Sequence, residues 1–183
     1  MSGTGGVREG LCARFVWRGD RGAEHFYGDV TGWWRDPRLL ADLGPALADL
    51  VRPLRPTVVL GLQSRGVLLG ALVARELGVG LVEVRKQRGP MADSDEWVGA
   101  TTPPDYRDRH LSLGFPRRLV DDWVVLVDDW VDTGGQALGT QRLVAATGGT
   151  WLGMVVVVDG LDNHRTRRAL GVHALLHMRD LPT

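Results

Sequence analysis

The residues in which chemistry is easiest to see form an apolar run that ends in two adjacent carboxylates, followed by a threonine and two glycines. The segment reads VVLVDDWVDTGGQ over residues 124–136. Four aliphatic residues in a row are typical of a strand buried on both faces in the middle of a parallel sheet. Asp128 and Asp129 are therefore predicted at the carboxyl end of that strand, which is where open α/β sheets bind their ligands.

These side chains match the groups of a sugar phosphate. Each carboxylate can accept a hydrogen bond from one hydroxyl of a vicinal diol, such as the ribose 2- and 3-hydroxyls, and each such bond contributes about 1.5 to 3 kcal/mol. Thr133, Gly134 and Gly135 would supply a hydroxyl and unhindered backbone N–H groups at the start of a helix, where a phosphate is favoured. The spacing predicts a phosphoribose site.

Three segments carry a family resemblance. Residues 124–136 resemble the 5-phosphoribosyl 1-diphosphate (PRPP) signature of the type I phosphoribosyltransferases, with Trp130 and Gln136 as departures. GLQSRGVLLGALVARELGVGLVEVRKQRG at 61–89 is similar to the adenine branch, and YGDVTGWWRDPRLL at 27–40 resembles the opening of that branch. The resemblance implies an α/β fold, a twisted parallel sheet flanked by helices with a small N-terminal hood and a flexible lid loop.

The resemblance also assigns binding roles. Asp128 and Asp129 would accept the ribose hydroxyls. The 5-phosphate would lie on Asp132, Thr133, Gly134, Gly135 and Gln136, mostly on backbone donors. Diphosphate would bind Ser64, Arg65, Gly66, Arg85 and Lys86, in a loop where the family often has a cis peptide. Lys86 is the only lysine of the chain; the alternative for it is a solvated side chain after a strand.

Two carboxyl groups are candidates for catalysis. Asp132 occupies a position where the 6-oxopurine branch also has aspartate, so it is either a general base or a structural acceptor for nearby backbone N–H groups. Asp105 aligns with the catalytic glutamate of the adenine branch, or is a solvated loop acid. Tyr106 would cover the site, and Arg107 and Arg109 would reach the diphosphate when the lid closes.

The base is less well defined by the sequence. Where the adenine branch has a purine-contacting arginine, this chain has Gly28, followed by Trp33 and Trp34, which either stack on a base or belong to the core. An adenine-like purine is expected, with a 6-oxopurine or a pyrimidine as alternatives. His173 and His177 lie four apart on a predicted strand, a spacing that does not suit a metal site.

The elements expected around these residues alternate between helix and strand. Helices are predicted at 37–51, 67–77, 136–147 and 162–170, and strands at 57–62, 81–84, 124–127, 151–158 and 172–176. We expect one domain over 1–183, with 1–10 disordered, about 11–50 forming the hood and first helix, and about 90–112 forming the lid.

Composition excludes several classes of protein. The 22 basic side chains balance 22 acidic ones, whereas nucleic-acid binders carry a basic excess. No apolar run approaches the roughly 20 residues that span a bilayer, no signal peptide is evident, and Cys12 as the only cysteine excludes an intrachain disulfide and agrees with the cytoplasm.

The expected function is transfer of a 5-phosphoribosyl group from PRPP to a nitrogenous base, which makes a nucleoside monophosphate and pyrophosphate. The resemblance implies Mg²⁺ as cofactor and a homodimer. One alternative is a non-catalytic PRPP-sensing regulator. A response-regulator receiver also has an acidic pair after a strand, but there the pair closes the first strand and lacks the following Thr-Gly-Gly.

Overall fold

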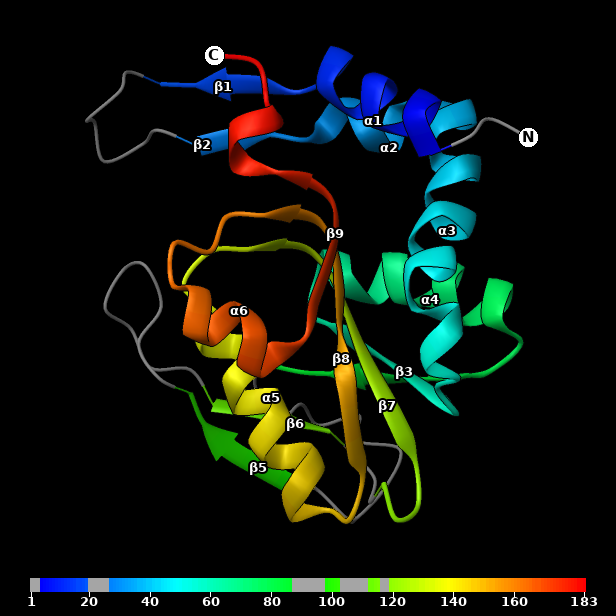
Figure 1. Ribbon diagram of the computed structural model, residues 1–183, viewed down its shortest axis with the longest axis vertical. Helices are drawn as coiled ribbons and strands as arrows, with labels where there is room; N and C mark the ends of the chain where they lie inside the picture. Colours follow the sequence, from blue (N-terminus) through cyan, green and yellow to red (C-terminus); the bar gives the residue numbers. More distant parts are fainter. Residues whose placement is uncertain (1–3, 20–26, 87–97, 103–111, 116–118) are drawn as a thin grey trace.

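A parallel sheet of five strands forms the centre of the protein in the computed structural model (Figure 1), which describes residues 4–19, 27–86, 98–102, 112–115 and 119–183. The strand order is β4-β3-β7-β8-β9, and every neighbouring pair is parallel. Their bounds are β3 Val58–Leu62, β4 Gly80–Val84, β7 Trp123–Val131, β8 Thr150–Asp159 and β9 Val172–His177. The predicted parallel sheet is therefore confirmed.

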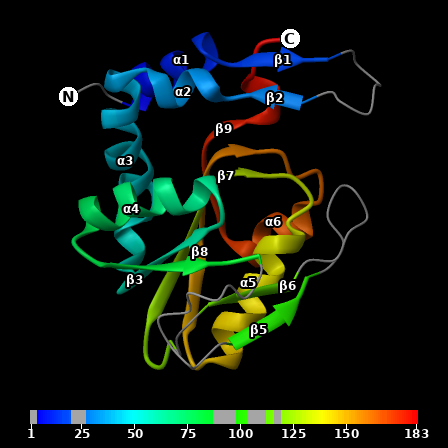
Figure 2. The ribbon, with the colours of Figure 1, turned by 180° about the vertical axis from the view of Figure 1, so that it is seen from behind.

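Helices cover both faces of this sheet (Figures 1 and 2). Helices α3 (Pro37–Val51) and α4 (Arg65–Leu77) lie on one face, and α5 (Gly135–Ala146) and α6 (His164–Leu170) lie on the other. Short 3-10 turns follow α3 and β9, at Arg52–Leu54 and Met178–Asp180. Two buried apolar clusters result, one on each face. None of the helices within the described residues is long and apolar enough to span a bilayer.

Local chemistry explains why the expected helices form where they do. Asp36 caps α3 by accepting hydrogen bonds from the N–H groups of Arg38 and Leu39, and Pro37 occupies the first turn. Gly78 ends α4 in the left-handed conformation, with φ 71°. These caps explain the close agreement between the expected and observed bounds of α3 and the ends of α4.

The expectation of disorder at residues 1–10 is wrong from residue 4 onward. Thr4–Ala13 form helix α1, because Val7 and Leu11 lie four apart on one side and are 2% and 0% exposed. The hood consists of α1, the antiparallel strands β1 (Val16–Arg18) and β2 (Tyr27–Asp29), and helix α2 (Thr31–Arg35). It lies at one end of the sheet (Figure 1).

The predicted lid interval is not a continuous loop. Val98–Thr101 and Ser112–Phe115 pair as the antiparallel strands β5 and β6. Thr102 is 2% exposed beside Gly139 of α5, and backbone hydrogen bonds join Arg85 to Gly114. This ribbon forms because burial against α5 and pairing at Arg85 satisfy its apolar and backbone groups. The lid candidates Asp105, Tyr106, Arg107 and Arg109 lie outside the described residues.

The strand expected to end at Val127 continues to Val131. Strand β8 is equally long and pairs with the extension, with Asp128 opposite Val156 and Val131 opposite Asp159. β3 pairs with β7 only as far as Gly61 opposite Val127. Asp128 and Asp129 therefore lie within β7, at the point where its neighbour on the other side has ended.

Candidate active site

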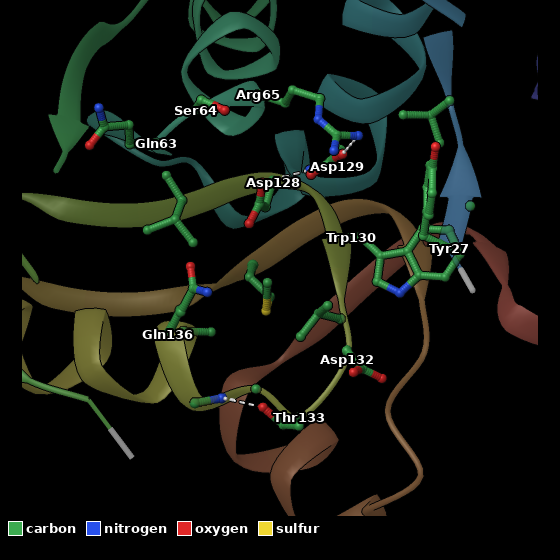
Figure 3. A pocket seen from close by; sticks show the side chains of 18 of the residues that line it. Tyr27, Gln63, Ser64, Arg65, Asp128, Asp129, Trp130, Asp132, Thr133 and Gln136 are labelled. Atoms are coloured by element: carbon green, nitrogen blue, oxygen red, sulfur yellow. Dashed lines mark hydrogen bonds and ion pairs between the residues drawn. The ribbon is translucent and has the colours of Figure 1, made fainter. Parts of the chain in front are cut away.

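A pocket of about 660 Å³ opens where β3 ends beside β7, below the hood. Figure 3 shows Ser64 and Arg65 on one side of β7, Thr133 and Gln136 on the other, and Tyr27 and Trp130 at one end. The lining residues are Trp17, Tyr27, Gly28, Val30, Leu62, Gln63, Ser64, Arg65, Lys86, Asp128, Asp129, Trp130, Val131, Asp132, Thr133, Gly134, Gly135, Gln136, Ala137, Met154 and Met178. Ten of the predicted site residues are among them.

The acidic pair lies in the middle of the pocket. Burial, together with the charge of Asp129, raises the pKa of Asp128 well above its usual value, although Lys86 acts in the opposite direction. The Asp129 backbone N–H donates to Asp128 Oδ1 at 2.9 Å. Asp129 pairs with the guanidinium of Arg65 at 2.6 Å. A buried carboxyl beside a charged one stabilises ligands that donate hydrogen bonds, and sugar hydroxyls are such donors.

The turn at 63–66 faces this pair closely. Its Gln63–Ser64 peptide is cis, as the resemblance implies. Gly66 begins the approach of α4 to β7, because a Cβ there would lie 2.6 Å from the Val127 carbonyl oxygen and 2.9 Å from Asp128 Oδ1. Gly66 itself does not line the pocket. It lets the positive end of α4 contact the acidic strand.

Of the two basic residues after β4, only Lys86 lines the pocket. Its backbone N–H donates to Gln63 Oε1 at 3.0 Å, which connects the end of β4 to the turn after β3. Arg85 Nε pairs with Glu83 at 2.7 Å, and Arg85 is not among the lining residues. Lys86 and Arg65 are therefore the cations that the structure brings to the pocket from the predicted basic wall.

The opposite wall is the loop that leads into α5. Gly134 is the N-cap residue, with φ 79°, and a Cβ there would lie 2.8 Å from Thr166 Cγ2 of α6. The Thr133 hydroxyl oxygen accepts from the Gly135 N–H at 3.3 Å, which leaves its own hydrogen to donate. A helix of twelve residues thus begins at the pocket without a side-chain cap from Gly134, an arrangement that suits a phosphate.

Asp132 lies between β7 and this loop. Its carboxylate is turned away from the side chains of Thr133 and Gln136 (Figure 3). Partial burial, and then the charge of Asp162, raise the pKa of Asp132 above its usual value. A carboxyl group in this state is suited to proton exchange with a bound ligand.

Aromatic rings form the hood side of the pocket. Trp17, Tyr27 and Trp130 line it, and Phe15 packs behind, with its centroid 4.9 Å from that of Trp17 and 6.2 Å from that of Trp130. Gly28 is required by this packing, because a Cβ there would lie 2.7 Å from the Phe15 ring. The position where the adenine branch has arginine is thus filled by a ring of the core.

The tryptophans proposed as possible stacking partners belong to the core instead. Trp33 is 0% exposed and its Nε1 donates to the Leu11 carbonyl at 2.9 Å, and Trp34 packs half-buried on the same cluster. Sequence reasoning missed Trp17 and Met178, which line the pocket from β1 and from the turn after β9. Neither follows a motif, since only tertiary packing brings them to the site.

The donor set bears on the implied metal. Within the described part of the chain, no group of three or more His, Cys, Asp or Glu side chains could hold a metal ion. Mg²⁺ is often bound by one or two carboxylates together with substrate phosphates and water. Asp128 and Asp129 fit a Mg²⁺ ion that arrives with a diphosphate, and do not form a dedicated cage.

Comparison with known proteins agrees with this geometry. Residues 35–172 match the phosphoribosyl transferase domain. The chain is 34% identical to the adenine phosphoribosyltransferase of Drosophila pseudoobscura pseudoobscura over 154 residues, 82% of this chain and 83% of that one.

Solved structures agree as well. The adenine phosphoribosyltransferase of Thermoanaerobacter pseudethanolicus has the same fold, with a TM-score of 0.81 at 24% identity over 93% of this chain and 99% of that one. The Saccharomyces cerevisiae enzyme, solved with adenine and D-2,5-dideoxy-2,5-imino-altritol 1,6-bisphosphate, has a TM-score of 0.75 at 26% identity over 94% and 99%. The chain therefore belongs to the type I phosphoribosyltransferase family, in its adenine phosphoribosyltransferase branch.

Proposed function

We propose that this protein transfers the 5-phosphoribosyl group from PRPP to a purine base, adenine or a close analogue, and releases a nucleoside monophosphate and pyrophosphate. The observation that carries the proposal is the arrangement around β7. Asp128 and Asp129 lie between the turn that holds Ser64 and Arg65 and the helix-starting loop at 133–136 (Figure 3). Diol, diphosphate and 5-phosphate can thus bind at once.

In this arrangement the ribose hydroxyls donate to Asp128 and Asp129. The 5-phosphate binds the Thr133 hydroxyl and the first backbone N–H groups of α5. Arg65, which pairs with Asp129 at 2.6 Å and is 47% exposed, can turn to the diphosphate when a hydroxyl takes its place on Asp129. Lys86 adds the second positive charge. Binding of the sugar and neutralisation of the leaving group are therefore coupled through one ion pair.

The chemical step breaks the bond between C1 of the sugar and a diphosphate oxygen, while a base nitrogen forms the new bond to C1. The acidic pair stabilises positive charge that develops on the sugar ring. Asp132 takes the proton that the base loses. Mg²⁺ carried on the diphosphate would add positive charge at the leaving group. The aromatic side chains Trp17, Tyr27 and Trp130 exclude water and offer faces to the base.

A specific observation favours a second candidate for the base. Asp132, with its raised pKa, lines the pocket, and the 6-oxopurine branch has aspartate at this position. Gly28 removes the arginine expected of the adenine branch. A 6-oxopurine is thus the second candidate, whereas adenine is supported by the relatives that share both the fold and about a third of the sequence.

The test combines ligand binding with turnover. We expect the wild-type protein with PRPP and Mg²⁺ to release pyrophosphate when adenine is added, and hypoxanthine, guanine and uracil provide the comparison. Asp128→Asn with Asp129→Asn should weaken PRPP binding at least about a hundredfold, since two charge-assisted hydrogen bonds are lost. Asp49→Asn, on an exposed part of α3, is the matched control.

Unchanged PRPP affinity in the double variant, measured by calorimetry, would refute the site. Tight PRPP binding without pyrophosphate release for any base would favour the PRPP-sensing alternative. We further propose a homodimer in the cytoplasm. The exposed Leu68 of α4 and Leu81 of the edge strand β4 are available for a subunit contact, and sedimentation velocity tests the oligomeric state.

A further inference from the structure

The segment 177–182, which follows β9, joins the hood to the sheet. It contacts α1 and β1, although more than 150 residues separate them in the sequence. The Arg8 side chain of α1 pairs with Asp180 Oδ2 at 3.1 Å, and the Cys12 thiol donates to the Asp180 carbonyl at 3.3 Å. Trp17 Nε1 of β1 donates to the Pro182 carbonyl at 2.9 Å. Figure 1 shows this segment against the hood strands.

Asp180 also organises the turn in which it lies. Its Oδ2 accepts from the His177 backbone N–H at 2.9 Å, and the His177 side chain accepts from the Asp180 backbone N–H in return. The His177 N–H, and then the Arg8 charge, lower the pKa of Asp180, so this carboxylate is ionised at neutral pH. Leu181, 6% exposed, packs in the cluster that contains Leu11 and Phe15 of the hood.

Both structures that Asp180 contacts carry a side chain into the pocket. The 3-10 turn presents Met178, and the hood presents Trp17, whose indole is fixed by the Pro182 carbonyl. Trp17 in turn packs edge-on against Phe15 and Trp130. Met178, Trp17 and Trp130 lie on the aromatic side of the pocket, away from the loops that take the two phosphates.

We propose that Asp180 is a positioning residue for the base: it holds the turn with Met178 and the hood with Trp17 in register, and so sets the width of the base-binding side without contacting PRPP. The proposal rests on the proposed phosphoribosyl transfer. Loss of Asp180 should let the hood move relative to β9 and leave the phosphate loops, which belong to α4 and α5, in place.

Asp180→Ala tests this proposal against Asp49→Ala, which removes an equally exposed Arg–Asp pair on α3 far from the pocket. We expect the KM for the base to rise about five- to tenfold, from the loss of one exposed ion pair and one capping acceptor. The kcat and the calorimetric Kd for PRPP should stay within about twofold of wild type. Arg8→Gln, which keeps the turn and removes only the hood contact, should give part of the KM effect.

Hydrogen exchange of the ligand-free protein separates this proposal from the activity. In Asp180→Ala the hood amides of α1, β1 and β2 should exchange about five- to tenfold faster, while those of β7 and α5 should not change. Equal losses of base and PRPP affinity, or unchanged hood exchange, would overturn the positioning role. If the wild-type protein transfers no base, the proposed function fails, and faster hood exchange in Asp180→Ala but not in Asp49→Ala still supports the positioning role.

Discussion

Three carboxyl groups of the pocket, only a few residues apart on β7, have different environments. Asp128 is buried beside a second carboxylate, which raises its pKa; Asp129 is paired with Arg65; and Asp132 is partly buried near Asp162, which also raises its pKa. Different environments give chemically identical side chains different functions. The pair is suited to accepting hydroxyl groups, and Asp132 is suited to moving a proton.

The role of Asp132 can be measured from the pH dependence of turnover. Because its pKa is raised, its ionised, proton-accepting form is lost as pH falls through that raised value. The kcat/KM of the wild type should therefore decline on the acid side with the titration of one group. Asp132→Asn should lose this limb and about 10² to 10⁴ in kcat/KM, the range for removal of a general base.

Pyrophosphate release measured between about pH 4.5 and 9 gives the two profiles. Asp162→Asn is the control, because it removes only the neighbouring charge and should move the acid limb to lower pH without abolishing it. A wild-type profile retained by Asp132→Asn would assign Asp132 the structural role that the sequence left open.

At the scale of elements, the site depends on how closely α4 approaches the strands. A Cβ at Gly61 would lie 2.7 Å from Val67 Cα, and one at Gly70 would lie 2.9 Å from Leu81 Cδ1. Together with Gly66, these glycines let the helix backbone rest on β3 and β7. The turn that presents Ser64 and Arg65 therefore has little freedom to move relative to Asp128 and Asp129.

Gly66→Ala should destabilise the protein by about 1 to 3 kcal/mol, the usual cost of overpacking, because the new methyl group would meet the Val127 carbonyl oxygen at 2.6 Å. PRPP affinity should fall as well, since the helix must move away from Asp128. Gly5→Ala in α1 meets no atom within 4 Å and should be neutral or stabilising by up to about 1 kcal/mol. Urea unfolding of both variants checks the difference, and equal stability would refute the close approach.

At the scale of the whole molecule, the two ends of the described chain meet in the hood. Val7, Leu11 and Phe15 share one apolar cluster with α3, with the face of the sheet toward α3 and α4, and with Leu181. Burial of aliphatic side chains contributes about 1.5 to 3 kcal/mol each. The hood is therefore part of the same cooperative core as the sheet that carries the site.

Leu11→Ala tests whether the N-terminal residues belong to this core. Leu11 is 0% exposed, so the truncation should lower the free energy of unfolding by about 2 to 5 kcal/mol. Glu9→Ala, at an exposed position of the same helix, should change it by less than about 0.5 kcal/mol. Thermal and urea unfolding give both values. A neutral Leu11→Ala would return α1 to the disordered segment expected from composition.

The sequence by itself determined the features that depend on residues close together in the chain. Aliphatic runs located β3, β7, β8 and β9, and the caps Asp36 and Gly78 located helix ends, because these signals act within a turn or a strand. The order Asp-Asp followed by Thr-Gly-Gly identified the sugar-phosphate loop for the same reason. The predicted lid residues Asp105, Tyr106, Arg107 and Arg109 remain predictions.

Only the tertiary structure decided the features that need distant segments to meet. β7 extends to Val131 because β8 pairs with it, and α1 forms because Leu11 is buried on its tertiary partners. The base side of the pocket combines Trp17, Trp130 and Met178 from β1, β7 and the turn after β9. Contacts of this kind are made by packing over more than a hundred residues of sequence separation, and no local pattern records them.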